Sequence, residues 1–394
     1  MISNPRSHIM GEFRGTEHGP TVVIISGIHG NEPAGVMALE EICREIREGD
    51  MEIKGSLYAL RGNLEALRQG KRFIDEDLNR IWRKERIEML FGSKTLNNEE
   101  RAMKELLDIL RTIFKKSSPP YYFIDLHSTS GDTHPFITIN DALINRNFAR
   151  LYQLPIILGI EEYLSGPLLN YLNLEGWLSM GLEVGQHHAP VSLKNAVSLI
   201  WMTLVFTGLL NLSQCADFKA HRIRISASAG GLRGFYEIFY RERISAGDQF
   251  KMVPGFRNFD PVAAETLLAN RNGKEIISHR RGILFMPLYQ AQGEDGFFLV
   301  RDIPAWILQL SVLTRKIRSK EILALLPGIC ITGQDHADLW VTAKTFKRMG
   351  KPIFHLLGYR CTLMESGDYR MTNREFRAKS IAYSGAPWKN GLLK

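Results

Sequence analysis

The chain of 394 residues is long enough for two or three domains and for a substantial buried core. Hydrophobic residues at 44% and charged residues at 23% exclude the disordered and fibrous classes of protein. The net charge of +8 arises from residue 344 onward, where eleven Lys/Arg face three Asp/Glu, so the basic pI says little about the substrate of the main body.

Three further features bear on the compartment of the protein. The four cysteines are widely spaced and form no C-x-x-C pair, which argues against a disulfide scaffold or a zinc knuckle and suits a reducing compartment. The N-terminal stretch lacks the apolar core of a signal peptide, so we expect a cytoplasmic protein. The apolar run 196–210 is shorter than the ~20 residues that a bilayer requires, so we expect a buried core helix and no membrane contact.

Strands and helices alternate along the first half of the chain. Short apolar, β-branched runs predict buried strands, and apolar residues at helical spacing predict the intervening helices. One helix begins at an asparagine cap, Asn98, with acidic residues in its first turn and lysines in its last. In chain order the predicted elements are 21–28, 34–49, 56–63, 97–116 and 121–131. The pattern predicts an α/β fold with a mostly parallel or mixed central sheet flanked by helices, over residues 1–214.

The sequence pattern changes after residue 214. The segment 221–231 alternates apolar and polar residues, and short strand-like runs separated by glycine-rich turns follow it, so we predict a smaller β-rich domain over 215–303. Residues 304–326 are predicted to be helical. The remainder of 304–394 is a basic C-terminal extension in which we see no interpretable pattern and to which we assign no role.

His29 and Glu32 lie just past the end of the first predicted strand, between glycines. Ligands of open α/β sheets bind outside the carboxyl ends of strands. A His and a carboxylate three residues apart can converge on one metal if the chain turns there. Taken alone, this H-x-x-E pattern is more often a surface His and Glu near the start of a helix.

A third ligand is expected at the end of another central strand, and His127 in FIDLHSTSG has that position. Imidazole nitrogens with one carboxylate oxygen form the ligand set of catalytic zinc, which keeps a position for water. We therefore expect one zinc ion per chain, held by His29, Glu32 and His127. These ligand types also suit other divalent metals.

The segment 70–82 gathers Arg72, Asn79 and Arg80 in a short loop-like stretch. It can be a salt-bridged turn that leads into a helix. It can also be functional, with the arginines polarising a carbonyl and stabilising the oxyanion that forms when water attacks it. Asn79 would then hold a polar group of the substrate.

Glu183 stands in the apolar run LSMGLEVG. A carboxylate in such a run is costly unless it is on an edge, paired or functional. A zinc hydrolase needs a general base that takes a proton from water and passes it to the leaving amine. Glu183 is our candidate, whereas Glu175 lies in a more polar stretch and is expected at the surface.

With these motifs in order, the chain resembles the succinylglutamate desuccinylase/aspartoacylase family, relatives of the zinc carboxypeptidases. The matching stretches are GIHGNEPAG, GNLEAL followed by RFIDEDLNRIW, IDLHSTSG and LEVGQH. The resemblance implies the same three zinc ligands, Glu183 as general base, Arg80 and Arg72 at the scissile carbonyl, and Asn79 on the carboxylate side of the substrate. It also implies that the β-rich domain covers the mouth of the active site.

The implied reaction is hydrolysis of the amide bond of a small N-acyl amino acid. Aspartoacylases carry a further substrate-binding arginine about ten residues before the glutamate, and here the matching position is near Asn173. This departure weakens the case for an N-acylaspartate, and GNLEALRQGKRFIDEDLNR is closer to the desuccinylase version. The acyl group and the amino acid are not determined by the sequence.

Two alternatives remain open at this point. One is a carboxypeptidase-like hydrolase of small or cell-wall peptides, and the other is a metal-binding or interaction protein without catalysis. The aromatic residues of the basic extension could interleave with bases, but a solvated appendage or a subunit contact is the simpler interpretation, so we expect no nucleic-acid partner. The sequence leaves open whether the chain forms a homo-oligomer.

Overall fold

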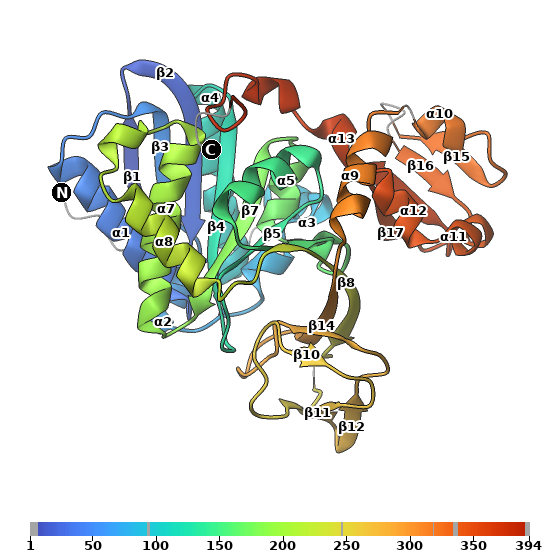
Figure 1. The fold of residues 1–394 in the computed structure, drawn as a ribbon. Helices are drawn as coiled ribbons and strands as arrows, with labels where there is room; N and C mark the ends of the chain where they lie inside the picture. The colour runs from blue at the N-terminus through green and yellow to red at the C-terminus, as the bar shows by residue number, and fades with distance from the viewer. Residues whose placement is uncertain (1–6, 93–94, 246, 318, 334–337, 391–394) are drawn as a thin grey trace.

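The structure is a computed structural model, which describes residues 7–92, 95–245, 247–317, 319–333 and 338–390. An eleven-stranded mixed sheet runs through the described chain (Figure 1). Its strand order is β1 (Ile9–Arg14), β3 (Lys54–Arg61), β2 (Glu17–Ser26), β4 (Tyr121–Thr129), β7 (Leu178–Gln186), β5 (Phe136–Ile139), β6 (Pro155–Leu158), β8 (Gly234–Arg243), β14 (Asp295–Asp302), β13 (Gly282–Phe285) and β10 (Pro261–Val262). β3, β2, β4 and β7 are parallel neighbours, while β5 runs antiparallel to β7. The predicted α/β fold with a mostly parallel or mixed sheet is confirmed.

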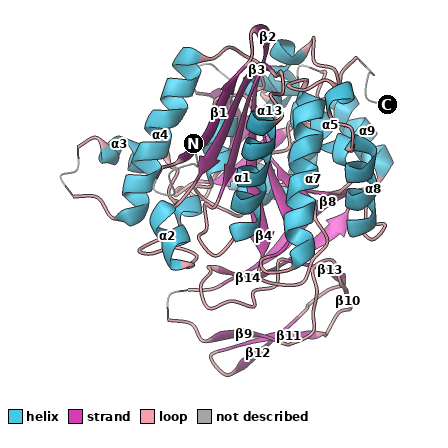
Figure 2. Cartoon of the chain, turned by 90° about the vertical axis from the view of Figure 1, so that its left-hand side faces the viewer, coloured by secondary structure: helices cyan, strands magenta, loops and turns pink. Residues whose placement is uncertain are grey.

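Helices cover both faces of the parallel part of the sheet (Figure 2). Because side chains alternate along a strand, Val22 and Ile24 of β2 pack into one hydrophobic cluster, and Val23 and Ile25 pack into another. The first cluster is completed by α1 (Pro33–Glu48), α5 (Leu143–Ala149), α7 (Pro190–Thr207) and α8 (Phe218–Ser228). The second cluster is completed by α3 (Lys84–Leu90), α4 (Asn98–Lys116) and α6 (Leu168–Leu174). Burial on both faces explains why these strands are continuous apolar runs.

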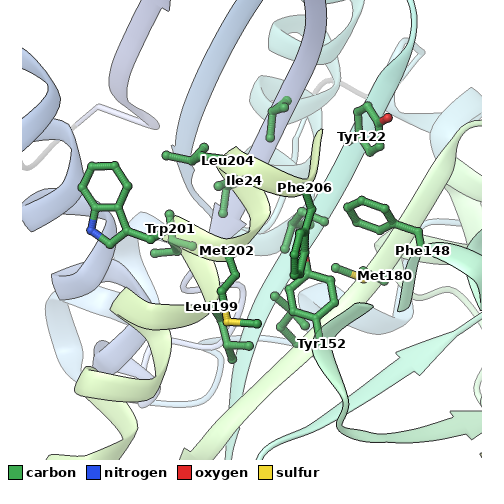
Figure 3. Packing of buried hydrophobic residues seen from close by; sticks show 14 of the residues in the cluster. Ile24, Tyr122, Phe148, Tyr152, Met180, Leu199, Trp201, Met202, Leu204 and Phe206 are labelled. Carbon is green, nitrogen blue, oxygen red and sulfur yellow. The ribbon is translucent and has the colours of Figure 1, made fainter. Parts of the chain in front are cut away.

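The apolar helix α7 is the one helix among the described residues that is long and apolar enough to cross a membrane. Its side chains instead fill the first cluster, and 72% of its apolar window is buried inside the protein. Figure 3 shows Leu199, Met202 and Phe206 of α7 among residues of the strands and of α5. The predicted core helix is confirmed.

Two local predictions were wrong. The cap of α4 is Asn97, one residue earlier than predicted, and it forms a capping box with Glu100. The alternating segment 221–231 is largely the helix α8 and not a strand. Phe218 and Ile225, seven residues apart, are buried against α7, whereas Ile223 is 60% exposed, a separation that a helix allows and a strand does not.

The β-rich region does not form a separate sheet throughout. β8 and β14 extend the central sheet, and a three-stranded antiparallel sheet of β9 (Phe250–Met252), β11 (Leu267–Arg271) and β12 (Lys274–Ile277) lies beyond them (Figure 1). The loop between β13 and β14 leads from this region back to the carboxyl edge of β2 and β4, since Gln290 accepts a hydrogen bond from Asn31 at 2.8 Å.

The C-terminal extension contains a four-stranded antiparallel sheet that the sequence did not suggest. Its core joins strands to helices around Leu339, Phe354, Tyr359 and Met371. The elements are α9 (Ala305–Thr314), α10 (Ser319–Leu323), β15 (Ile329–Thr332), β16 (Asp338–Val341), α11 (Ala343–Met349), α12 (Lys351–Leu356), β17 (Tyr359–Leu363), β18 (Tyr369–Asn373) and α13 (Arg374–Arg377). Only its helical beginning was predicted, because the strands are short and carry mixed residue types.

The end of the chain returns to the first domain. The hydroxyl of Tyr383 accepts a hydrogen bond from the backbone N–H of Leu178 at 2.8 Å, and Trp388 donates one to Tyr122 at 3.1 Å. Both aromatic side chains belong to the first hydrophobic cluster. Residues near the end of the extension are therefore packed against the first domain.

Candidate metal centre and active site

A tight turn after β2 places His29 and Glu32. Gly27 has φ +72°, and a Cβ on Gly30 would lie 2.0 Å from the backbone carbonyl carbon of Ala66, so the turn requires glycine at both positions. The helix α1 then begins at Pro33 with Glu32 as its N-cap residue. His29 and Glu32 are both buried, and Nδ1 of His29 lies 2.8 Å from Oε1 of Glu32.

His127 reaches the same carboxylate from the end of β4. Its Nδ1 lies 3.1 Å from Oε2 of Glu32, which also accepts the backbone N–H of Ser128 at 2.9 Å. One candidate ligand atom from each of His29, Glu32 and His127 lies within 4.8 Å of the others. The structure thus brings together the three residues that we predicted as metal ligands.

Two aspartates hold the outer nitrogens of these imidazoles. Nε2 of His29 lies 3.1 Å from Oδ1 of Asp77, and Nε2 of His127 lies 2.8 Å from Oδ2 of Asp125. Metal-binding histidines commonly donate their second N–H to a carboxylate, which fixes the ring and its tautomer. Both Nδ1 atoms are left facing Glu32, as joint coordination of one ion requires.

The electrostatics of the cluster also fit a cation. Burial opposes the charged form of His127, but the carboxylates of Asp125 and Glu32 outweigh it and raise the pKa of His127 well above its ordinary value. The carboxylates of Glu32, Asp77 and Asp125 are all buried, so positive charge between them is stabilising. Two imidazoles and a carboxylate are a zinc-type donor set, so these residues fit the ion that the sequence led us to expect.

Glu183 projects from β7, directly opposite His127 of β4 in the strand register. Its side chain is 7% exposed, and its Oε2 has no hydrogen-bond partner among the described residues. Burial raises the pKa of Glu183 to about 8. A buried carboxyl group with a free oxygen and a raised pKa is suited to accepting and returning a proton near neutral pH.

The segment before α3 supplies Arg72, Asn79 and Arg80, the latter two from the short 3-10 helix η1 (Leu78–Arg80). Arg72 donates to Oδ2 of Asp77 at 2.9 Å, and its Nη1 lies 3.8 Å from Glu32. Arg80 donates to Asp295 of β14 at 3.1 Å. Carboxylates therefore hold both arginines in place beside the cluster of His29, Glu32 and His127.

Asn79 uses its side-chain oxygen to accept the backbone N–H of Leu168 at 2.9 Å, at the start of α6. This bond leaves the amide nitrogen of Asn79 for another partner. The residues proposed from the sequence share one cavity, whose wall also includes the 286–295 loop of the β-rich region. Its lining includes all seven of them: His29, Glu32, Arg72, Asn79, Arg80, His127 and Glu183.

Several residues of the site were not predicted. Asp125 could have been found, since it lies two residues before His127 and so shares its face of the strand. Asp77 lies within the segment 70–82, but its pairing with His29 depends on a loop conformation that the sequence does not reveal. Asp295 and Glu161, which also line the cavity, come from distant segments and carry no local sequence signal.

The fold and the cluster define an α/β protein with a metal-compatible site at the carboxyl edge of its sheet. Residues 18–199 match the family model described as the succinylglutamate desuccinylase/aspartoacylase catalytic domain. This part of the chain is therefore similar to the catalytic domain of the succinylglutamate desuccinylase/aspartoacylase family, as its motifs predicted.

Curated relatives match over a short part of the chain. A succinylglutamate desuccinylase of Photorhabdus laumondii is 31% identical over 126 residues, which are 30% of this chain and 36% of the relative. One of Pseudomonas fluorescens is 36% identical over 80 residues, which are 20% of this chain and 24% of the relative. The chain thus spans about a third or less of the length of these relatives.

Solved structures match over a longer stretch at lower identity. A succinylglutamate desuccinylase/aspartoacylase of Rhodobacter sphaeroides is 16% identical with a TM-score of 0.54, and the match covers 74% of this chain and 88% of that one. An ectoine utilization protein of Ruegeria pomeroyi is 18% identical with a TM-score of 0.53, covering 74% and 87%. These likenesses support the fold beyond the catalytic domain.

Proposed function

We propose that this protein is a zinc-dependent hydrolase that cleaves the amide bond of a small N-acyl amino acid in the cytoplasm. The observation that carries the proposal is the free, buried carboxyl oxygen of Glu183 in the cavity that holds the His29–Glu32–His127 cluster. The names of the curated relatives support a desuccinylase or deacylase type of reaction.

His29, Glu32 and His127 would hold the ion, with Asp125 and Asp77 orienting the two imidazoles. When bound, a zinc ion supplies a Lewis acid for the scissile carbonyl and lowers the pKa of a water ligand. The backbone N–H of Ser128 holds Oε2 of Glu32 at 2.9 Å and so keeps this carboxylate in place between the rings.

Glu183 serves as the general base and then as the general acid. Its free oxygen accepts a proton from the attacking water and delivers it to the leaving nitrogen. The raised pKa of Glu183 supports the second step. A carboxyl group with a pKa of about 8 remains protonated until a more basic group, such as the leaving amine, takes the proton. The amino acid then leaves with a neutral or protonated amine.

Arg80 and Arg72 face the charge that develops on the carbonyl oxygen. Their ion pairs with Asp295 and Asp77 hold the guanidinium groups before substrate arrives, so little reorganisation is needed during the reaction. The amide nitrogen of Asn79 is available for the carboxylate of the amino acid. These roles use each charged residue of the site predicted from the sequence.

The test is release of free amine from N-succinyl, N-acetyl and N-formyl amino acids and from short peptides, with zinc-loaded protein and a chelated control. Chelator-sensitive release from an acyl amino acid supports the proposal. Cleavage of peptides alone would favour the carboxypeptidase-like alternative. Zinc binding with no cleavage of any compound would favour a metal-binding or interaction protein without catalysis.

A further inference from the structure

The cavity of the active site continues away from the metal cluster to a polar far end. Phe136 of β5 is paired with Glu183 of β7, and Ile139 is paired with Met180, so Asn140 begins a region about 13 Å along the strands from Glu183. Ile139 is also paired with Leu158 of β6, which leads into the 3-10 helix η3 (Ile160–Glu162). Both segments line the cavity.

Among the described residues that line this far end, Glu161 carries the carboxylate. Its side chain is 1% exposed, and Oε1 accepts hydrogen bonds from Nε and Nη2 of Arg374 at 3.1 and 2.6 Å. Its Oε2 is buried and has no hydrogen-bond partner among the described residues. A buried polar atom without a partner is costly, so an atom of this kind in a cavity wall marks a place for a ligand donor.

The rest of the far wall consists of side-chain amide groups and apolar side chains. It is made by Asn140, Asn170 and Asn173 together with Ile160 and Leu169. The described lining contains two arginines and no lysine, and both arginines are tied to Asp77 and Asp295 at the metal end. A substrate arm that ended in a carboxylate would therefore face the unpaired oxygen of Glu161, while the nearby guanidinium of Arg374 is engaged by the other oxygen and does not line the cavity.

We propose that this far end is a subsite, formed by Glu161, for a nitrogen hydrogen-bond donor at the tip of the substrate's side chain. A charged ammonium or guanidinium donor is favoured over a neutral amide, because charge-assisted hydrogen bonds are the stronger ones. The inference rests on the proposed function and narrows its substrates to N-acyl amino acids with long, donor-bearing side chains.

Arg374 of the C-terminal extension is the positioning residue of this subsite. It also bonds to Asn140 at 3.2 Å and to Glu162 at 2.9 Å, so it joins the two segments of the far wall. The extension thereby gains a role that the sequence did not suggest: it holds Glu161 with one oxygen engaged and the other free.

The test compares Nα-acetyl derivatives of lysine, glutamine, glutamate and norleucine. For the native protein we expect kcat/KM for the lysine derivative to exceed that for glutamate and norleucine by about tenfold or more, with glutamine between them. In Glu161→Gln, Arg374 still requires an acceptor, so the new amide oxygen faces Arg374 and the NH₂ group takes the place of Oε2. The order of lysine and glutamate should then reverse. An unchanged order, or a native preference for glutamate, overturns the subsite.

Glu162→Gln is the matched control, since Glu162 also binds Arg374 but does not line the cavity. It should keep the native order. If Glu161→Gln does not fold, Asn170→Lys adds a cation to the same wall without touching Arg374. It should weaken selection of lysine and leave norleucine nearly unchanged, and retention of the native preference would contradict the subsite.

Calorimetry with the free amino acids separates this inference from the proposed function. If the acyl derivatives are not hydrolysed, the proposed reaction fails, but lysine should still bind about tenfold more tightly than norleucine, and Glu161→Gln should abolish the difference. Equal binding of lysine and norleucine, or no binding of either, overturns the subsite whatever the reaction.

Discussion

Asp125 and His127 stand two residues apart on β4, and Oδ2 of Asp125 lies 2.8 Å from Nε2 of His127. The same arrangement recurs across the site, where Asp77 lies 3.1 Å from Nε2 of His29. Each aspartate directs the opposite nitrogen, Nδ1, towards Glu32. The geometry of the candidate metal centre is therefore set by two carboxylates that are not themselves ligands.

We expect Asp125→Asn and Asp77→Asn each to lower zinc affinity by about 10- to 100-fold, because the amide holds the imidazole less firmly and lowers its basicity. Competition with a chromophoric chelator measures the change. Asp108→Asn on the exposed face of α4 is the control and should bind zinc like the native protein. Native affinity in both site variants would show that the aspartates do not orient the ligands.

His29→Ala and His127→Ala should each lose stoichiometric zinc, because each removes one of three protein ligands. Metal analysis after desalting measures the occupancy. His18→Ala, which changes an exposed histidine, should retain one ion per chain. A full complement of zinc in either ligand variant would contradict the assignment.

Glu183→Gln should retain zinc and lose turnover by about 10²- to 10⁴-fold, because an amide cannot accept the proton of water. The measurement combines metal analysis with amine release. Glu175→Gln removes an exposed acid eight residues earlier and serves as the matched control with native turnover expected. Near-normal turnover in Glu183→Gln would exclude Glu183 as the base.

Arg80→Ala should lower kcat/KM by about 10²- to 10³-fold through loss of a positive group near the developing oxyanion. Zinc affinity should change far less, because Arg80 pairs with Asp295 and not with a ligand. Parallel titration of zinc and measurement of kcat/KM separate the two effects. Equal losses in both would indicate a structural role for Arg80.

The contact between the first domain and the C-terminal extension should be sensitive to acid. Burial opposes ionisation of Asp141 and Glu162, but Arg146 and Arg315 around Asp141, and His355 and Arg374 around Glu162, outweigh it and lower the pKa of both carboxyls. Groups with a lowered folded-state pKa stabilise fully above their ordinary value of about 4 and lose that contribution as pH falls below it.

The melting temperature should therefore fall as the pH is lowered from about 5, since the unfolded chain binds these protons more readily than the folded one. Asp141→Asn and Glu162→Gln should each be less stable near neutral pH and show a weaker acid dependence. Thermal unfolding followed from pH 7 to 3 measures this, with Glu365→Gln at an exposed position as control. If the melting temperature of both variants depended on pH as that of the native chain does, the two carboxyl groups would not be the source of the acid sensitivity.

In the first half of the molecule, the local sequence pattern was sufficient to predict several strands and helices and the turn of the candidate site. The apolar run before Gly27 predicted β2, and glycines at 27 and 30 predicted the turn that carries His29 and Glu32. The placement of His127 also followed, because parallel strands end at a common edge and polar residues at that edge converge. Glu183 was proposed as a carboxylate in an apolar run and through the family resemblance. The structure adds the order of strands, in which β4 lies between β2 and β7 and so brings His29, His127 and Glu183 to one edge.

The local sequence pattern failed to predict secondary structure where packing against distant parts of the chain decides which residues are buried. The alternation around Ile223 and Ile225 is compatible with a strand, and only packing against α7 makes it the helix α8. The strands of the C-terminal sheet are four or five residues long, too short for periodicity to distinguish them from loops.

The sequence by itself determined the order of strands and helices, the family motifs and the set of candidate ligands, because spacing and residue type are local properties. Only the tertiary structure decided which charges meet: Asp295 with Arg80, and Arg374 with Glu161, 213 residues away. Such pairs form because folding buries both partners in one place and neither can remain buried without the other. No local signal in the sequence records that requirement.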